Sequence, residues 1–257
     1  MRDDHCFVVL AYGDSPFLDG CIRGLRAQTI QTGIVVATST PSPFVAESAA
    51  RHGIEVRVNP KKEGIGADWN FGLNQTGARY VTLAHQDDTY EPRFAERTLK
   101  LFEKCPRAAL CFTGYREIDD HGVEKHSKIS RVKHLLDGAI VGPREEVKGN
   151  RLKAFLAFGN PLPCSSVTFN RARLPDFQFS LDYASNLDWD AWVQLQEQGE
   201  TFLHAPERLI GRRHNPLTAT SRLIREGVRQ REDLMMFRRI WPAPLGDAIA
   251  YLYRASY

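Results

Sequence analysis

The sequence of 257 residues contains no apolar run near the roughly 20 residues that a membrane-spanning helix needs. Its first residues, Met1 to Cys6, are polar and acidic, and they show no signal-peptide pattern. Cysteine is scarce: there are five, without metal-binding spacing, and an odd number favours free thiols in a reducing compartment. These absences predict a soluble cytoplasmic protein.

Two common nucleotide-binding signatures are also missing. No Gly-x-Gly-x-x-Gly sequence follows the first predicted strand, and there is no P-loop, so neither a Rossmann dinucleotide site nor a P-loop NTPase is supported. The net charge of +3 is too small to indicate nucleic-acid binding, and we expect no nucleic-acid partner. With 42% hydrophobic residues, the chain is long enough to bury the core of one large domain.

Apolar runs of strand length alternate with segments of helical periodicity over the first half of the chain. The predicted strands cover 6–12, 33–37, 54–58, 80–84 and 108–113, and predicted helices start near Ser15-Pro16 and Ser42-Pro43 and cover 65–76 and 94–104. This alternation predicts an α/β fold with a mostly parallel central sheet flanked by helices. Ligands of such sheets bind beyond the carboxyl ends of the strands.

The strongest chemical signal is the pair Asp87-Asp88, which follows the apolar run Tyr80 to Ala84. Adjacent carboxylates repel each other, and a hard divalent cation commonly offsets that repulsion. Capping of a turn and of the next helix is the alternative interpretation. Polar or aromatic residues also follow the other predicted strands, at 12–14, 38–40 and 59–62. Because these ends should meet at one edge of the sheet, we favour a metal site.

In their order and spacing, these segments resemble the family 2 glycosyltransferases, which have the GT-A fold. The similar segments are 7–12 and 25–29 (opening strand and first helix), 59–73 (before the acidic motif), His85-Gln-Asp-Asp88 (the Asp-x-Asp-type motif), 160–171 (acceptor side), Leu187-Asp188 (the Glu-Asp pair) and Arg213-His214 (the late Arg/His motif). The resemblance covers about residues 5–216.

This resemblance implies a GT-A domain over 1–216, with a nucleotide-binding half at 1–114 and an acceptor-binding half at 115–216. It implies a metal-dependent, inverting, hexosyltransferase-type enzyme in cell-surface polysaccharide synthesis. The donor would be a nucleotide sugar, with UDP as the expected nucleotide, and the acceptor a saccharide or glycolipid. Mn²⁺ or Mg²⁺ would be the cofactor. Asp88 is assigned to the metal, Asp87 to the ribose hydroxyls or a second metal position, and His214 is a further candidate ligand; the roles of Asp87 and Asp88 are interchangeable.

Asp188 is the candidate catalytic base, which would deprotonate the acceptor hydroxyl. Its place at the start of a predicted helix favours the ionised carboxylate, which would lower its basicity. Helix capping is the alternative role, and Asp190 is a competing base. The candidate donor-binding residues are Ala11, Tyr12, Thr38, Asn59, Lys62, Asn70, Gln86, Asp87 and Arg213.

Three departures from the family pattern are visible. His85 replaces the first acid of the longer acidic motif, Leu187 replaces the glutamate before the base, and Thr38-Ser39 stands where many members have an aspartate that reads uracil. These departures leave open an alternative function, a catalytically silent sugar-nucleotide-binding or scaffold protein on the same fold.

The last residues, 217–257, lie outside the resemblance and are predicted to form a helical extension. Within it, 221–241 carries six arginines and apolar residues at helical spacing. A basic amphipathic helix of this kind binds anionic membranes, which would place the protein at the inner face of the membrane, near lipid-linked acceptors. Packing on its own domain, or on a second subunit in a homodimer, is the interpretation that we favour.

Overall fold

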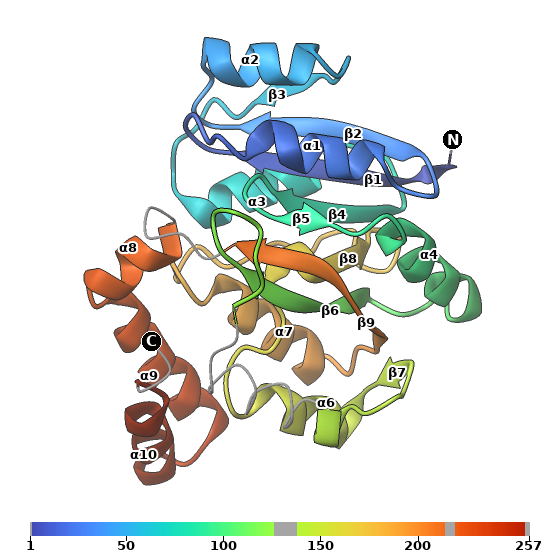
Figure 1. The fold of residues 1–257 in the computed structure, drawn as a ribbon. Coiled ribbons are helices and arrows are strands. Elements are labelled where there is room, and N and C mark those ends of the chain that lie inside the picture. The colour runs from blue at the N-terminus through green and yellow to red at the C-terminus, as the bar shows by residue number, and fades with distance from the viewer. Residues whose placement is uncertain (1, 126–137, 214–218, 255–257) are drawn as a thin grey trace.

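The computed structural model describes residues 2–125, 138–213 and 219–254, which form one sheet with helices on both faces (Figure 1). The strands are β1 (Arg2–Ala11), β2 (Thr32–Thr38), β3 (Val56–Val58), β4 (Tyr80–His85), β5 (Thr89–Tyr90), β6 (Leu110–Ile118), β7 (Glu146–Val147), β8 (Val167–Asn170) and β9 (Phe202–Arg213). The helices are α1 (Leu18–Arg26), α2 (Pro43–Ala50), α3 (Ile65–Leu73), α4 (Phe94–Lys104), α6 (Gly149–Leu156), α7 (Leu187–Glu197), α8 (Ala219–Arg225), α9 (Val228–Ile240) and α10 (Ala243–Tyr253), with a 3₁₀ turn, η1 (Cys164–Ser166).

The strand order is β3-β2-β1-β4-β8-β6-β9-β5, and β7 pairs with β9. β1, β2, β3 and β4 run parallel, β8 inserts antiparallel between β4 and β6, and β6 pairs parallel with β9. Most paired residues therefore lie in parallel ladders, and the predicted α/β class is confirmed. The carboxyl ends of β1, β2 and β4 meet at one edge, as expected for a site there.

Alternating side chains divide the core into two layers. In β1, Phe7 and Val9 pack under α1, α2 and α4, whereas Val8 faces the opposite layer, formed with α3, α6, α7 and α9. This follows from the two-residue period of a strand, which sends successive apolar residues to opposite faces. Both faces of the central strands are buried, and this explains why their sequences are continuous apolar runs.

Local signals in the sequence predicted some element boundaries and missed others. Ser42 caps α2 as expected, because its hydroxyl accepts the Val45 N–H at 3.2 Å. The helix predicted to start near Ser15-Pro16 begins later, at Leu18, and Ser15 does not cap it: the Ser15 hydroxyl donates to Asp87 Oδ1 at 2.5 Å. The expected single helix at 221–241 is two helices, α8 and α9, separated at Gly227, whose φ of 70° interrupts the helical backbone.

The helical extension packs against its own domain. Met236 and Phe237 of α9 are fully buried in the same core layer as Trp189 and Trp192 of α7. The indole of Trp241 donates to the Ala157 carbonyl at 2.8 Å. Among the helices of the described residues, none combines the length and the apolar character that crossing a membrane requires. Membrane contact through this extension and a homodimer stay predictions.

The close crossing of α9 and α10 generates a first prediction. A Cβ added to Gly246 would lie 2.9 Å from the Phe237 carbonyl oxygen, so the two helix backbones would have to separate. We expect Gly246→Ala to lower the free energy of unfolding by about 1–3 kcal/mol, measured by urea denaturation. Gly20→Ala in α1 is the matched control, because a Cβ there meets open space and should stabilise the helix by about 0.5–1 kcal/mol. Equal effects of the two substitutions would contradict the prediction.

Candidate functional site

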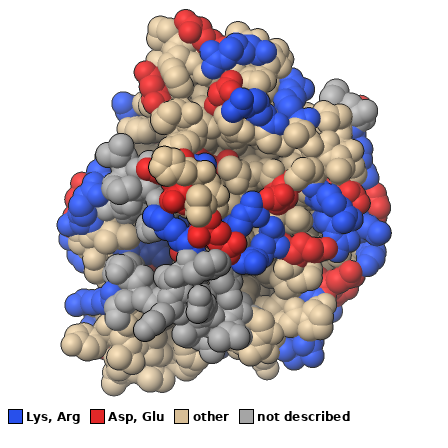
Figure 2. Space-filling view, in the orientation of Figure 1, with Lys and Arg blue, Asp and Glu red and all other residues tan. Residues whose placement is uncertain are grey.

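A cavity of about 390 Å³ lies at the carboxyl ends of β1, β2 and β4. On the face shown in Figure 2, acidic and basic side chains of the described residues are interspersed, and no broad area of one sign is visible there. The cavity itself is lined by side chains of both signs, among them Asp68 and Arg212. Of the residues predicted from the sequence, those that line it are Ala11, Tyr12, Thr38, Gln86, Asp87, Asp88, Asp188 and Arg213.

The acidic pair lies in the tight turn that follows β4. The Asp88 N–H donates to the His85 carbonyl at 3.1 Å, which closes the turn. Asp87 Oδ1 accepts the Ser15 hydroxyl, and Asp88 Oδ1 accepts the Arg213 N–H at 2.9 Å. Burial raises the pKa of both carboxyl groups above the ordinary value, and the neighbouring charge of Asp88 raises that of Asp87 further. The two acids are therefore held close together where water is largely excluded.

Asp88 Oδ2 is the atom that best fits a metal ion. It is buried and makes no hydrogen bond within the described residues, although the nearby Ser165 hydroxyl favours the ionised form of Asp88. A buried carboxylate oxygen without a partner is costly, and a cation or a ligand hydroxyl would satisfy it. The described residues contain no cluster of three or more His, Cys, Asp and Glu that could hold a metal ion by themselves. A cation here would therefore need oxygen atoms of a bound ligand to complete its coordination, as is common for Mg²⁺. His214 lies outside the described residues.

Arg213 fastens the acidic turn to the end of β9. Besides its backbone bond to Asp88, its Nε donates to the Asp87 carbonyl at 2.9 Å, and its guanidinium donates to the Asp119 carbonyl and lies 4.1 Å from the centre of the Phe17 ring. Gln86 makes a comparable connection to β1, because its side chain bonds both the N–H and the carbonyl of Tyr12, at 3.2 and 2.8 Å. These contacts fix the turn against two strands far apart in the sequence.

Asp188 enters the cavity from the first turn of α7. It is buried, and its Oδ1 accepts the Trp189 N–H at 2.9 Å. Burial raises its pKa above the ordinary value, although Arg229, the Asn160 side chain and Arg212 all favour the ionised form. The helix terminus was expected to lower the basicity of this group, but desolvation outweighs it. Asp188 is thus a stronger base than a surface aspartate.

Asp190, the competing base, is directed elsewhere. It is buried, but it pairs with Arg239 at 2.5 Å, accepts from Gln194 at 2.6 Å and does not line the cavity. Two residues along a helix differ by about 200° in direction, which explains why the neighbouring acid faces away. The geometry therefore favours Asp188 over Asp190.

The acidic turn and Asp188 share one space. Burial raises the pKa of the Cys164 thiol well above its ordinary value, and the charges of Asp188 and Asp88 raise it further. His85 responds to the same groups: burial lowers its pKa to about 4, while Asp87 and Asp188 oppose that change. Both side chains line the cavity. The acidic turn and Asp188 thus line the same cavity as these two side chains, and a ligand bound there would lie near both.

Three predicted donor-binding residues do not line the cavity, and two of them, Asn59 and Lys62, contact residues that do. Asn59 is buried and donates to Asp68 Oδ1 at 2.9 Å. Asn70 exchanges two hydrogen bonds with the backbone of Phe179, at 2.7 and 2.9 Å. The Lys62 ammonium lies 5.7 Å from the centre of the Tyr12 ring. Their direct contact with a donor stays a prediction.

The structure adds residues that the sequence interpretation missed. Asp68 lines the cavity beside Thr38, and its other carboxylate oxygen accepts the Ser39 hydroxyl at 2.8 Å. An acid from α3 therefore lies beside the Thr38-Ser39 segment, which lacks one. Arg222 and Arg229 of the extension also line the cavity, although they lie beyond the family resemblance. The arginine-rich composition of 221–241 was their only signal in the sequence.

Comparison with known proteins was made for sequence and for structure. Residues 6–170 match the family model described as "Glycosyl transferase family 2". A curated relative, "Putative glycosyltransferase EpsH" of Bacillus subtilis (strain 168), is 23% identical over 150 residues, which cover 52% of this chain and 43% of the relative. The chain thus spans less than half the length of this relative.

The solved structures with the same fold include two complexes with nucleotide sugars. TarS 1–349 of S. aureus in complex with UDP-GlcNAc has a TM-score of 0.67 and 12% identity, and the match covers 98% of this chain and 72% of that one. The mannosyltransferase PcManGT from Pyrobaculum calidifontis in complex with GDP-Man and Mn²⁺ has a TM-score of 0.69 and 14% identity, covering 99% and 70%. The match to a longer TarS structure covers only 43% of that chain. At these identities the likeness shows the fold.

The depressed pKa of His85 generates a second prediction. The folded state keeps this imidazole neutral down to about pH 4, whereas the unfolded chain takes up the proton near pH 6.5, so stability falls as the pH is lowered through this window. His85 should contribute up to about 2 kcal/mol of the loss between pH 7 and pH 5. We expect His85→Gln to lose less stability than wild type over this interval, measured by urea denaturation at both pH values.

His5 provides the matched control, because it is buried and burial lowers its pKa to about 3. Its contribution remains in the His85→Gln protein, so a smaller pH dependence should persist there. An unchanged pH dependence in His85→Gln would show that His85 is not the group responsible.

Proposed function

The chain belongs to glycosyl transferase family 2, and on this basis we propose that it transfers a sugar from a nucleotide-sugar donor to a saccharide or glycolipid acceptor. The observation that carries this proposal is the shared cavity, which Asp87, Asp88 and the buried base candidate Asp188 all line. A role in cell-surface polysaccharide synthesis, on the cytoplasmic side of the membrane, is part of the proposal. Residues 1–114 would bind the donor and residues 115–216 the acceptor.

The donor would occupy the part of the cavity formed by β1, β2 and α3. Tyr12, Thr38 and Asp68 offer an aromatic ring, a hydroxyl and a carboxylate for a nucleoside, and all three line the cavity. We propose UDP as the nucleotide, in line with the UDP-GlcNAc complex of TarS, while the GDP-Man complex of PcManGT makes GDP the nearest rival. Arg212 and Arg213 lie where guanidinium groups could bind diphosphate oxygens.

A divalent cation, Mn²⁺ or Mg²⁺, would neutralise the charge that develops on the diphosphate as it leaves. Asp88 would hold it through the unpartnered Oδ2, and Asp87 would take the ribose hydroxyls or a second position. The PcManGT complex with GDP-Man and Mn²⁺ supports this assignment by analogy. The buried turn contributes by keeping the two carboxylates fixed, so that little reorganisation is needed when the donor binds.

Asp188 would act as the general base. Its carboxylate takes the proton of the acceptor hydroxyl while the acceptor oxygen bonds to the anomeric carbon, and the bond from that carbon to the diphosphate breaks with its electron pair on the leaving oxygen. Attack from the face opposite the leaving group inverts the configuration. The pKa of Asp188, raised by burial, makes the group a better proton acceptor than an exposed aspartate.

Nucleotide binding tests the donor half of this proposal. Calorimetric titration with UDP, GDP and dTDP, each with and without Mn²⁺, should show binding of UDP that is strengthened by Mn²⁺. Asp88→Asn should abolish the strengthening, because it removes the charge that would hold the ion. Asp182→Asn, in an exposed loop outside the cavity, is the control and should bind like wild type.

The other outcomes of this titration are informative. Mn²⁺-dependent binding that survives in Asp88→Asn would remove Asp88 as the metal ligand. If UDP, GDP and dTDP bind equally well with and without Mn²⁺, the diphosphate contacts would be assigned to Arg212 and Arg213 instead of a metal ion. Nucleotide binding without turnover of any sugar nucleotide, tested against a broad set of acceptors, would favour the silent binding or scaffold protein.

Substitution of the base tests the chemical step. Asp188→Asn should keep nucleotide affinity within about twofold and lower kcat by about 10²–10⁴-fold, because only proton transfer is lost. Since burial raises the pKa of Asp188, wild-type kcat should fall on the acid side at a pH above the usual aspartate range, and this limb should disappear in the variant.

Asp190→Asn is the matched comparison, since Asp190 lies two residues away and outside the cavity. Once its folding is confirmed by circular dichroism, it should retain the pH profile of wild type and lose far less kcat than Asp188→Asn, because Asp190 contacts Arg239 of α9 and not the cavity. Retained transfer in Asp188→Asn together with lost transfer in Asp190→Asn would reverse the assignment of the base.

A further inference from the structure

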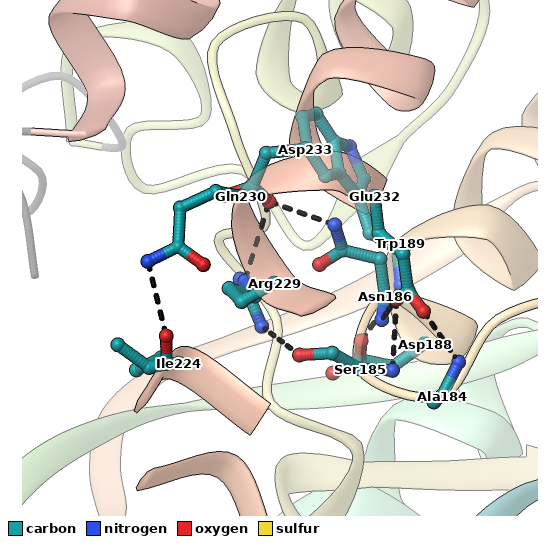
Figure 3. Close-up of polar contacts among 10 residues, drawn as sticks. All are labelled: Ala184, Ser185, Asn186, Asp188, Trp189, Ile224, Arg229, Gln230, Glu232 and Asp233. Atoms are coloured by element: carbon teal, nitrogen blue, oxygen red, sulfur yellow. Dashed lines mark hydrogen bonds and ion pairs between the residues drawn. The ribbon is translucent and has the colours of Figure 1, made fainter. Parts of the chain in front are cut away.

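Helix α9 of the extension binds the backbone of the segment that leads into α7. The Glu232 carboxylate accepts three consecutive N–H groups, those of Ala184, Ser185 and Asn186, each at 2.8 Å (Figure 3). Ala184 bonds to Oε1, and the other two bond to Oε2. Glu232 is buried, so these charge-assisted hydrogen bonds are shielded from water.

These three N–H groups lie where α7 cannot satisfy them. Asn186 is the N-cap residue of α7, and its side chain does not cap the helix. Its Nδ2 donates instead to Asp233 Oδ1 at 2.7 Å. The N–H groups at and before the start of a helix have no partner within it, so α9 supplies the acceptors from 46 to 48 residues further along the chain.

Arg229 connects the same cluster to the cavity. Its guanidinium pairs with Asp233 at 3.2 Å and donates to the Ser185 hydroxyl at 3.2 Å. Arg229 also lines the cavity, and its charge favours the ionised form of Asp188. Figure 3 shows Asp188 directly beside the residues that α9 binds. The extension therefore acts on Asp188 in two ways: Glu232 binds the backbone that precedes α7, and the charge of Arg229 favours the ionised carboxylate.

Helix α10 of the extension packs on the residue that precedes Asn160. The Tyr253 ring of α10 packs on Gly159, where an added Cβ would lie 2.6 Å from a ring carbon. Gly159 precedes Asn160, whose side chain favours the ionised form of Asp188. Trp189, the residue after the base, packs against Phe237 with ring centres 5.0 Å apart. Residues of α9 and α10 thus contact both the first turn of α7 and the segment before Asn160.

We propose that α9 is the positioning element of the base Asp188 and that Glu232, through its three backbone hydrogen bonds, is the residue that sets the position. Glu232 is a positioning residue, since the carboxylate is occupied by the backbone and does not line the cavity. In this proposal the C-terminal extension contributes to catalysis by positioning Asp188. This inference rests on the proposed role of Asp188, while the contact itself is independent of that role.

Glu232→Gln tests the proposal with little change in shape. A glutamine side chain has a single acceptor oxygen, so at least one of the three N–H groups loses its partner. We expect kcat to fall about 10- to 100-fold, because a small displacement of a catalytic group has effects of this size. The KM for the sugar nucleotide that the wild-type protein consumes, and the Kd for its nucleoside diphosphate, should stay within about twofold.

Asp247→Asn is the matched control within the same extension. Asp247 forms an exposed ion pair with Arg238 at 2.6 Å on the surface of α10, so its loss should leave kcat unchanged. If Glu232→Gln weakens nucleotide binding as much as it lowers kcat, or if it keeps wild-type kcat while folded, the positioning role is wrong.

Amide hydrogen exchange of the wild-type protein provides a test that needs neither a variant nor a substrate. The amides of Ala184, Ser185 and Asn186 should exchange slowly although they precede α7, and much more slowly than exposed loop amides. Fast exchange at all three positions would overturn the contact even if the protein is an active glycosyltransferase. Slow exchange in a protein without any transferase activity would instead locate the failure in the proposed function.

Discussion

Burial of carboxylates in one cavity is the constraint on which the rest of the site depends. Asp88 and Asp188 are buried, Asp87 is partly buried, and burial raises the pKa of all three. Keeping such groups ionised requires cations and oriented N–H donors nearby. The chain supplies them from segments remote in sequence: Arg212 and Arg213 from β9, and Arg229 from α9. The fold brings these segments together around the acids.

This arrangement explains how the sheet and the site are coupled. Arg213, at the end of β9, binds the turn after β4. In the sheet, β8 and β6 lie between β4 and β9, so Arg213 links these two strands directly, in addition to the strand pairing. Gln86 links the same turn to β1. An acidic turn held from both sides can remain in one conformation while a charged ligand binds and leaves, which is the preorganisation that electrostatic stabilisation needs.

The C-terminal helices extend the same principle to the base. The N–H groups at the start of a helix have no partner within the helix, so the position of its first turn depends on other groups that bind them. For α7, Glu232 and Asp233 of α9 bind the segment that precedes the helix. The apolar side of α9 is buried with Met236 and Phe237, and its acidic residues at 232 and 233 face the α7 segment. Core packing and the polar cluster therefore fix α9 together, and in our proposal this contact positions Asp188, the candidate base.

Asp188 was predicted from the resemblance to family 2 glycosyltransferases, whereas strand-length apolar runs, strand-end polar residues and the Asp87-Asp88 pair were enough to predict the α/β fold and the edge that carries the cavity. These features depend on local periodicity and on the rule that parallel strands bring their carboxyl ends together, so the sequence by itself determined them. The acid beside Thr38 and Ser39, the partner of Ser15, the supporting roles of Asn59 and Asn70, and the binding of the α7 segment by Glu232 were decided only by the tertiary structure. Each is a contact between residues from different elements, and side-chain direction and long-range packing, which local sequence does not encode, select which of many polar groups become partners.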